Sequence, residues 1–286
     1  MSAAARGRLE LLAAAVLFST GGAAIKATTL TSWQVAGFRS LIAAMAVALF
    51  IPSSRRHWSW RVLVVAAAYA STLVLFVLAN KLTTAANAIF LQATGPLYLL
   101  LLGPVLLREP IRRSDVLLIL VMACGMGLFF VGEQAPSRTA PDPWRGNVFG
   151  AFSGLSWALT IAGLRWIAGR AEGSEPGMAA VAAGNVIAGL VCLPMALPVV
   201  EAAASDWLVL IYLGVFQVGL AYLCLTRGVR HATALEASLL LLAEPALNPI
   251  WAWLVHTERP GTLAIFGGGL ILASSVLRSV WTIRRE

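Results

Sequence analysis

Charged residues are scarce in this chain of 286 residues, making up 12% of it against 59% hydrophobic residues. Soluble domains carry about twice that share of charge, so the composition excludes an ordinary soluble enzyme. Cysteine and histidine are also rare, with three of each. Cys124, Cys192 and Cys224 lie in apolar runs without metal-ligand spacing. This pattern argues against a disulfide framework and against a metal site.

Motifs for catalysis and nucleotide binding are absent as well. The sequence contains no HExxH, Gly-x-Ser-x-Gly or Walker pattern, and an enzyme within the membrane would need some acid–base or metal constellation. We therefore expect no enzyme activity, no cofactor and no metal. The net charge of +8 comes from basic residues in short loops between apolar runs, not from a basic groove. We expect no nucleic-acid partner.

Long apolar runs dominate what is present. A helix needs about 20 predominantly apolar residues to cross a bilayer. The sequence predicts ten such spans, at residues 9–26, 35–51, 60–80, 86–107, 116–132, 148–168, 178–198, 207–227, 234–255 and 263–281. We expect an all-α integral membrane protein with ten transmembrane helices, surrounded by the lipid bilayer.

One pattern occurs twice along the chain. A constant shift of 149 residues places Pro96 on Pro245 and Glu109 on Glu258. Five helices form each predicted repeat, and because five is odd, the second copy is expected to cross the membrane inverted, as in secondary transporters. The predicted organisation is a first repeat at 1–132, an extracytoplasmic linker at 133–145 and a second, inverted repeat at 146–286.

Lysine and arginine indicate the orientation. Most of the 21 basic residues fall in loops on one side of the predicted spans, and the positive-inside rule makes that side cytoplasmic. We expect a multi-pass protein of a bacterial-type inner membrane with both termini in the cytoplasm.

The order and spacing of several short motifs closely resemble the EamA family of the drug/metabolite transporter superfamily. The motifs are LFSTGGAAIK at 17–26, Phe38-Arg39, Pro96 with Glu109, Ser156-Trp157-Ala158, and Glu244-Pro245 with Glu258. Within the family, the chain looks most like YddG-type exporters of aromatic and other amino acids. The resemblance implies a secondary transporter that exports amino acids, aromatic and other bulky neutral ones in particular, and related metabolites by alternating access.

Other functions stay open at this stage. Another small metabolite or a cationic drug is an alternative substrate within the same superfamily. A membrane-embedded enzyme or a channel is an alternative of another class. The missing catalytic constellation argues against the enzyme, and the missing ring of like charges argues against many ion channels. Ten helices suffice for a complete carrier, so we expect a functional monomer.

Polar residues inside the spans are the candidates for substrate binding, because a charge at the bilayer centre costs about 2.5–3.5 kcal/mol on insertion scales. Glu244 precedes Pro245 and shares a helical face with Asn248 and Trp251. It is a predicted acceptor for a substrate ammonium or a proton; the alternative is a structural acid. Further residues are predicted to line the cavity or, alternatively, to bond between helices: Phe18, Ser19, Asn87, Leu91, Tyr98, Trp157, Thr160 and Gln217. Tyr69 is a further candidate for which helix packing is an equal interpretation.

Two basic residues lie near the predicted outer ends of the first two spans. Lys26 and Arg39 are predicted to attract a carboxylate or to form a gate. For Lys26 we favour a side chain that reaches the lipid headgroups, whereas Arg39 lies deeper and is expected to pair with a carbonyl or to gate. Glu109 and Glu258 end their spans and are expected to cap structure or to gate.

Overall fold

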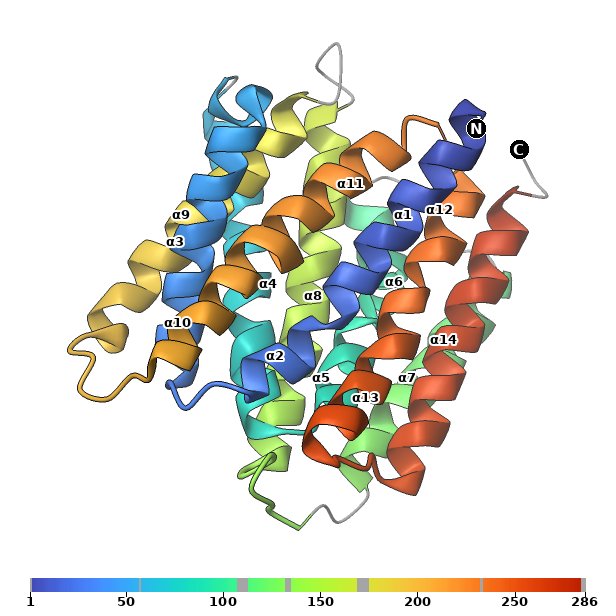
Figure 1. Cartoon of the computed structure of the whole chain (residues 1–286). Coiled ribbons are helices and arrows are strands. Elements are labelled where there is room, and N and C mark those ends of the chain that lie inside the picture. Colours follow the sequence, from blue (N-terminus) through green and yellow to red (C-terminus); the bar gives the residue numbers. More distant parts are fainter. Residues whose placement is uncertain are drawn as a thin grey trace.

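The computed structural model describes residues 2–56, 58–106, 113–131, 135–168, 175–231 and 234–283. Within these ranges the chain is helical, and its only β-type pairing is one isolated bridge between Ser137 and Ala140. The helices run roughly lengthwise through a single bundle (Figure 1). The N-terminus lies at the top of the view, and the end of the bundle that contains Glu258 lies at the bottom.

The first part of the chain forms these helices in order: α1 (Ala3–Ser19), α2 (Gly21–Lys26), α3 (Ser32–Phe50), the 3-10 turn η1 (Pro52–Arg55), α4 (Trp60–Leu82), α5 (Ala85–Gln92), α6 (Gly95–Leu106) and α7 (Arg113–Val131). Local sequence explains where several begin. The hydroxyls of Thr31, Ser59 and Thr84 accept hydrogen bonds from backbone N–H groups in the first turns of α3, α4 and α5, which satisfies otherwise unpaired donors.

The second part forms α8 (Pro143–Ala168), α9 (Glu175–Ala196), α10 (Ala204–Ile211), the π-helix η2 (Tyr212–Leu220), α11 (Ala221–Gly228), α12 (Ala234–Leu241), α13 (Ala243–His256) and α14 (Thr262–Ile283). Each predicted span falls on one helix or on consecutive helices. Eight stretches are long and apolar enough to cross a membrane, and Asp115–Val131 and Thr262–Leu277 are shorter apolar helices.

Breaks interrupt three spans that the sequence predicts as continuous. The fourth span breaks between α5 and α6, and the ninth breaks at Leu242 between α12 and α13. Pro96 and Pro245 lie in the first turns of α6 and α13, where the missing N–H of proline costs no helical hydrogen bond. The 149-residue shift carries Ala85–Gln92 onto Ala234–Leu241, so α5 and α12 correspond residue for residue.

The third break separates α1 from α2 at Thr20, whose hydroxyl donates to the Leu17 carbonyl oxygen. It has no proline and no counterpart in α8, which is continuous. Both α1 and α2 contact η2 and α13, and α2 also contacts α4 and α5.

Helix packing relies on small residues. The longest contacts join α4 to α8 and α9, and α3 to α9, while α7 and α14 lie side by side at one edge (Figure 1). A methyl group on Gly125 of α7 would lie 3.0 Å from the Gly267 carbonyl oxygen of α14. Gly125 and Gly267 therefore let α7 and α14 approach closely.

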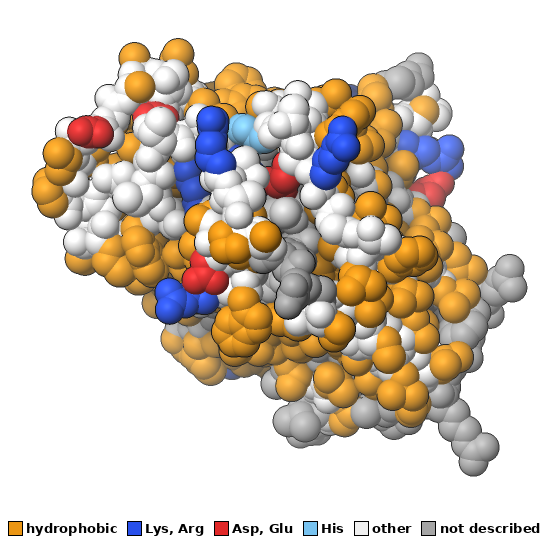
Figure 2. Space-filling model, turned by 90° about the horizontal axis from the view of Figure 1, so that it is seen from below, with side chains coloured by type: hydrophobic (Ala, Val, Ile, Leu, Met, Phe, Trp, Pro, Cys, Tyr) orange, Lys and Arg blue, Asp and Glu red, His pale blue; other side chains and the backbone are white. Residues whose placement is uncertain are grey.

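The outside of the bundle is apolar. Large hydrophobic side chains such as Leu49, Val131 and Phe266 are exposed. Figure 2 shows the Glu258 end, where charged side chains lie mainly among polar atoms and hydrophobic side chains cover most of the rim. This distribution fits a protein surrounded by lipid, with polar groups at the ends of the bundle.

Candidate functional site

The break at Thr20 brings the first helix against helices from the end of the chain. The Trp251 indole Nε1 donates to the Ser19 hydroxyl at 2.9 Å, and the Gln217 amide donates to the Phe18 carbonyl oxygen at 3.4 Å. The Thr20 and Tyr212 hydroxyls lie 2.9 Å apart in a further hydrogen bond. Three predicted site residues, Phe18, Ser19 and Gln217, therefore meet at this break.

Asn248 of α13 lies against Gly22 of α2. A methyl group on Gly22 would be 2.6 Å from Asn248 Oδ1 and 3.0 Å from Asn80 Oδ1, so only glycine fits between the two amides. Both side chains are fully buried, and neither oxygen has a hydrogen-bond partner in the described structure. Asn80 is absent from the predicted site; its only signal in the sequence is an amide at the end of an apolar span.

Aromatic rings form a cluster beside this junction. Tyr222 of α11 makes edge-on contacts with Phe18 and with Tyr69, with ring centroids 5.2 and 5.8 Å apart. Trp157 of α8 packs against the hydrophobic core that contains Tyr69 and covers Gly95, where a methyl group would lie 3.1 Å from its ring. Tyr222, Phe18 and Trp157 are all partly exposed although they lie deep within their spans.

Glu244 lies in the first turn of α13 and is also partly exposed. It interacts electrostatically with Tyr222 of α11. No Lys or Arg of the described ranges forms an ion pair with it. The Glu244 carboxyl group thus lies near Tyr222 of the aromatic cluster, and no cation of the described residues is paired with it.

Arg39 of α3 is deeply buried, with 1% of the residue exposed. Its Nη2 donates to the Leu73 carbonyl oxygen at 3.3 Å, which confirms the expected pairing with a carbonyl, while its Nε has no partner. Tyr69 and Tyr222 lie within electrostatic range of the guanidinium. Arg39 and Glu244 therefore both interact with Tyr222.

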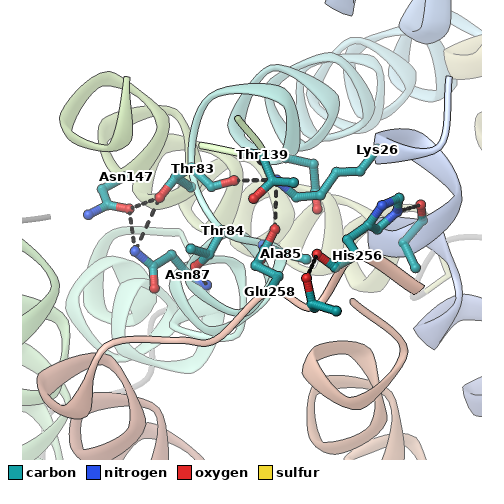
Figure 3. Close-up of polar contacts among 12 residues, drawn as sticks. Lys26, Thr83, Thr84, Ala85, Asn87, Thr139, Asn147, His256 and Glu258 are labelled. Carbon is teal, nitrogen blue, oxygen red and sulfur yellow. Dashed lines mark hydrogen bonds and ion pairs between the residues drawn. The ribbon is translucent and has the colours of Figure 1, made fainter. Parts of the chain in front are cut away.

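Asn87 makes contacts of a different kind. Its amide donates to Asn147 Oδ1 at 3.0 Å and to the Thr83 hydroxyl at 3.1 Å, and Asn147 in turn donates to the Phe129 carbonyl oxygen. This network joins α5, α7 and α8 near the Glu258 end (Figure 3). Asn87 thus makes the interhelical bonds that are the alternative to a cavity-lining role.

Three other predicted residues also make contacts within the helical packing. Leu91 is fully buried against Gly150 of α8. The Tyr98 hydroxyl lies 3.6 Å from the Met126 sulfur of α7, and the Thr160 hydroxyl donates to a carbonyl oxygen one turn earlier in α8. None of the contacts given for these three side chains is with Glu244.

Lys26 and Glu258 close the bundle at the end shown in Figure 3. Lys26 Nζ lies 3.2 Å from Glu258 Oε2 and donates to the Thr83 carbonyl oxygen at 2.7 Å and to that of Thr139. Glu258 Oε1 accepts from the Ala85 N–H at the start of α5. The prediction that Lys26 reaches lipid headgroups is wrong, because its side chain is buried and held by these partners. Glu109 lies outside the described residues.

Comparisons with known proteins agree on one family. The model of the "EamA-like transporter family" matches residues 5–131 and 144–280. The chain is 27% identical to the "Pseudopaline exporter CntI" of Pseudomonas aeruginosa, over 96% of this chain and 95% of the relative. It is 25% identical to the "Threonine/homoserine exporter RhtA" of Escherichia coli K12, over 74% and 68% of the two chains. A crystal structure superposes with a TM-score of 0.62 at 19% identity over 98% of each chain, which supports the fold.

Proposed function

Because this chain belongs to the EamA-like transporter family, we propose that it exports amino acids across the inner membrane as a secondary transporter. Aromatic and other bulky neutral amino acids are the proposed main substrates, in the manner of YddG-type exporters. One relative is described as an exporter of threonine and homoserine and another as an exporter of pseudopaline, so small-molecule export is the common theme.

The single observation that carries the substrate class is the position of Glu244 beside the aromatic cluster. A carboxyl group that pairs with no cation of the described residues suits a substrate ammonium. The partly exposed rings of Phe18, Trp157 and Tyr222 supply apolar area for a bulky side chain. Binding sites for small molecules combine a large apolar lining with a few placed polar groups in this way.

Alternating access is the proposed mechanism. Residues 1–132 and 146–286 act as two inverted five-helix halves joined by the 133–145 linker, with both termini in the cytoplasm. The contacts that support this division cross from one half to the other: Trp251 to Ser19, Gln217 to Phe18 and Glu258 to Lys26. The halves also pack on each other where α4 meets α8 and α9 and where α3 meets α9, so rocking would rearrange these interfaces as well as the polar contacts. One chain holds both halves, so a monomer suffices.

Counterflow in proteoliposomes tests the proposal. Vesicles with purified protein are loaded with an unlabelled amino acid and placed in a trace of the same labelled amino acid. We expect transient, saturable accumulation of phenylalanine or tryptophan, and none in protein-free vesicles. A cationic drug as the only compound to show counterflow would contradict amino-acid export and favour the alternative substrate class.

A further inference from the structure

Arg39 presents a charge without a counter-charge inside the bundle. It is the largest side chain among those less than 2% exposed. The groups that act on its guanidinium are Tyr69, Tyr222 and Cys192, and none of the described acids is among them. A buried charge in a membrane protein is costly and marks a functional site by default. The positive charge of Arg39 is therefore available to an anion that is not part of the described protein.

The hydrogen-bonding capacity of Arg39 is also largely unused. A guanidinium carries five N–H donors in a fixed fork. One contact, from Nη2 to the Leu73 carbonyl oxygen, is present, and Nε is buried without a partner. Such forks match carboxylates, which accept two parallel hydrogen bonds.

Further polar atoms lie beside this guanidinium without standard hydrogen bonds. The Tyr69 hydroxyl is buried close to Tyr222 and Asn185, yet no hydrogen bond of ordinary geometry satisfies it. The Asn185 Oδ1 is likewise buried without a partner. These groups come from α3, α4, α9 and α11, so they converge on one region from four helices and do not form a stripe along one of them.

We propose that Arg39 and the Tyr69 hydroxyl form the site that binds the substrate's carboxylate. This inference rests on the proposed function and extends it, because it assigns a binding site to the carboxylate of a zwitterionic amino acid. Tyr222 contacts the ring of Tyr69 and interacts electrostatically with both Glu244 and Arg39. The ammonium would lie at Glu244 and the carboxylate at Arg39, with the side chain of the substrate among the aromatic rings.

Three ligands that share a phenyl ring but differ in charge distinguish the ammonium site at Glu244 from the carboxylate site at Arg39. L-Phenylalanine carries both charges, 2-phenylethylamine only the ammonium, and 3-phenylpropionate only the carboxylate. Binding to purified protein is measured by calorimetry or by thermal stabilisation. Arg39→Met is expected to weaken the binding of phenylalanine and of phenylpropionate by more than about tenfold, as for loss of a hydrogen-bonded charge. The affinity for phenylethylamine should not change.

Two variants act as comparisons. Glu244→Gln is expected to have the opposite effect: it should weaken the binding of phenylethylamine and leave the affinity for phenylpropionate unchanged. Arg145→Met removes an arginine whose side chain is 73% exposed and is expected to change none of the three affinities. If Arg39→Met does not fold, Tyr69→Phe keeps the ring and removes the hydroxyl, and should weaken only the two carboxylate ligands.

Equal weakening of all three ligands by the Arg39 and Tyr69 variants, or no weakening of phenylpropionate, would overturn the carboxylate site. Absence of phenylpropionate and phenylalanine binding to the unmodified protein would overturn it as well. Failure of the proposed function looks different: phenylpropionate binding depends on Arg39, but no amino acid shows counterflow.

Discussion

The ion pair between Lys26 and Glu258 joins the end of α2 to the chain just beyond α13, and each side chain is only 3% exposed. Removing two charges from water carries a large desolvation penalty, which an opening that hydrates both charges would return. The backbone partners at Thr83, Thr139 and Ala85 hold the closed arrangement. This combination suits a gate that is well ordered when closed and that opens at a low cost in free energy.

Loss of one charge should therefore open the Glu258 end. In Glu258→Gln, Lys26 loses its ion-pair partner and is better solvated in the open form. A cysteine at Asn248, in a background without Cys124, Cys192 and Cys224, should react several-fold faster with an impermeant reagent added at that end. Glu236→Gln removes the exposed pair with Arg8, a type worth about 0–1 kcal/mol, and should not change the rate. Equal rates in all three proteins would rule out a gate here.

The orientation of the protein in the membrane can be tested by cysteine labelling. The bias of basic residues predicts cytoplasmic termini and an external linker. In the cysteine-free background, a cysteine at Ser137 should react with an impermeant maleimide on intact cells, and one at Ser2 should react only after the cells are opened. Labelling of Ser2 but not Ser137 on intact cells would reverse the topology.

Trp157 is expected to select for large side chains. It packs in the aromatic cluster, so Trp157→Ala removes apolar area from the proposed binding site, worth about 25 cal/mol for each Å². Export of tryptophan or phenylalanine should fall by about tenfold or more, while that of threonine changes little. Measurement of all three by counterflow checks this, and equal loss for every substrate at normal expression would contradict a selective role.

Gly22 should tolerate no side chain. Gly22→Ala places a methyl group 2.6 Å from Asn248 Oδ1, and overpacking of this kind costs about 1–3 kcal/mol. Gly127→Ala is the matched control, because a methyl group there meets nothing within 4 Å. We expect a lower melting temperature for the purified Gly22 variant and an unchanged or higher one for the Gly127 variant. Similar melting temperatures would show that the junction of α2 with α13 adapts.

Hydropathy located every described helical span, because an apolar run of this length has few alternatives in a membrane. The spans that contain Pro96 and Pro245 were predicted as continuous, and only the structure shows the break that precedes each proline. The break at Thr20 and the π-helix Tyr212–Leu220 have no proline, and both depend on packing between distant parts of the chain.

Local patterns also identified single polar residues but not their partners. Lys26 was expected at the headgroups because Glu258 is remote in sequence, and a pair of this kind depends on the arrangement of helices. Tyr222 was missed because it lies in the predominantly apolar run 218–225. Asn87 and Tyr98 had the same polar character as Asn248, and only the tertiary contacts separate the two groups.

The central claim is that Glu244 receives the substrate ammonium in an amino-acid transporter. Counterflow of labelled phenylalanine by proteoliposomes with unmodified protein or with Glu244→Gln tests it most directly. Loss of a charged hydrogen-bond acceptor predicts a half-saturation concentration raised by about tenfold, with an unchanged melting temperature. The same half-saturation concentration in both proteins, with pH-driven uptake also unaltered, would contradict the claim and leave Glu244 a structural acid.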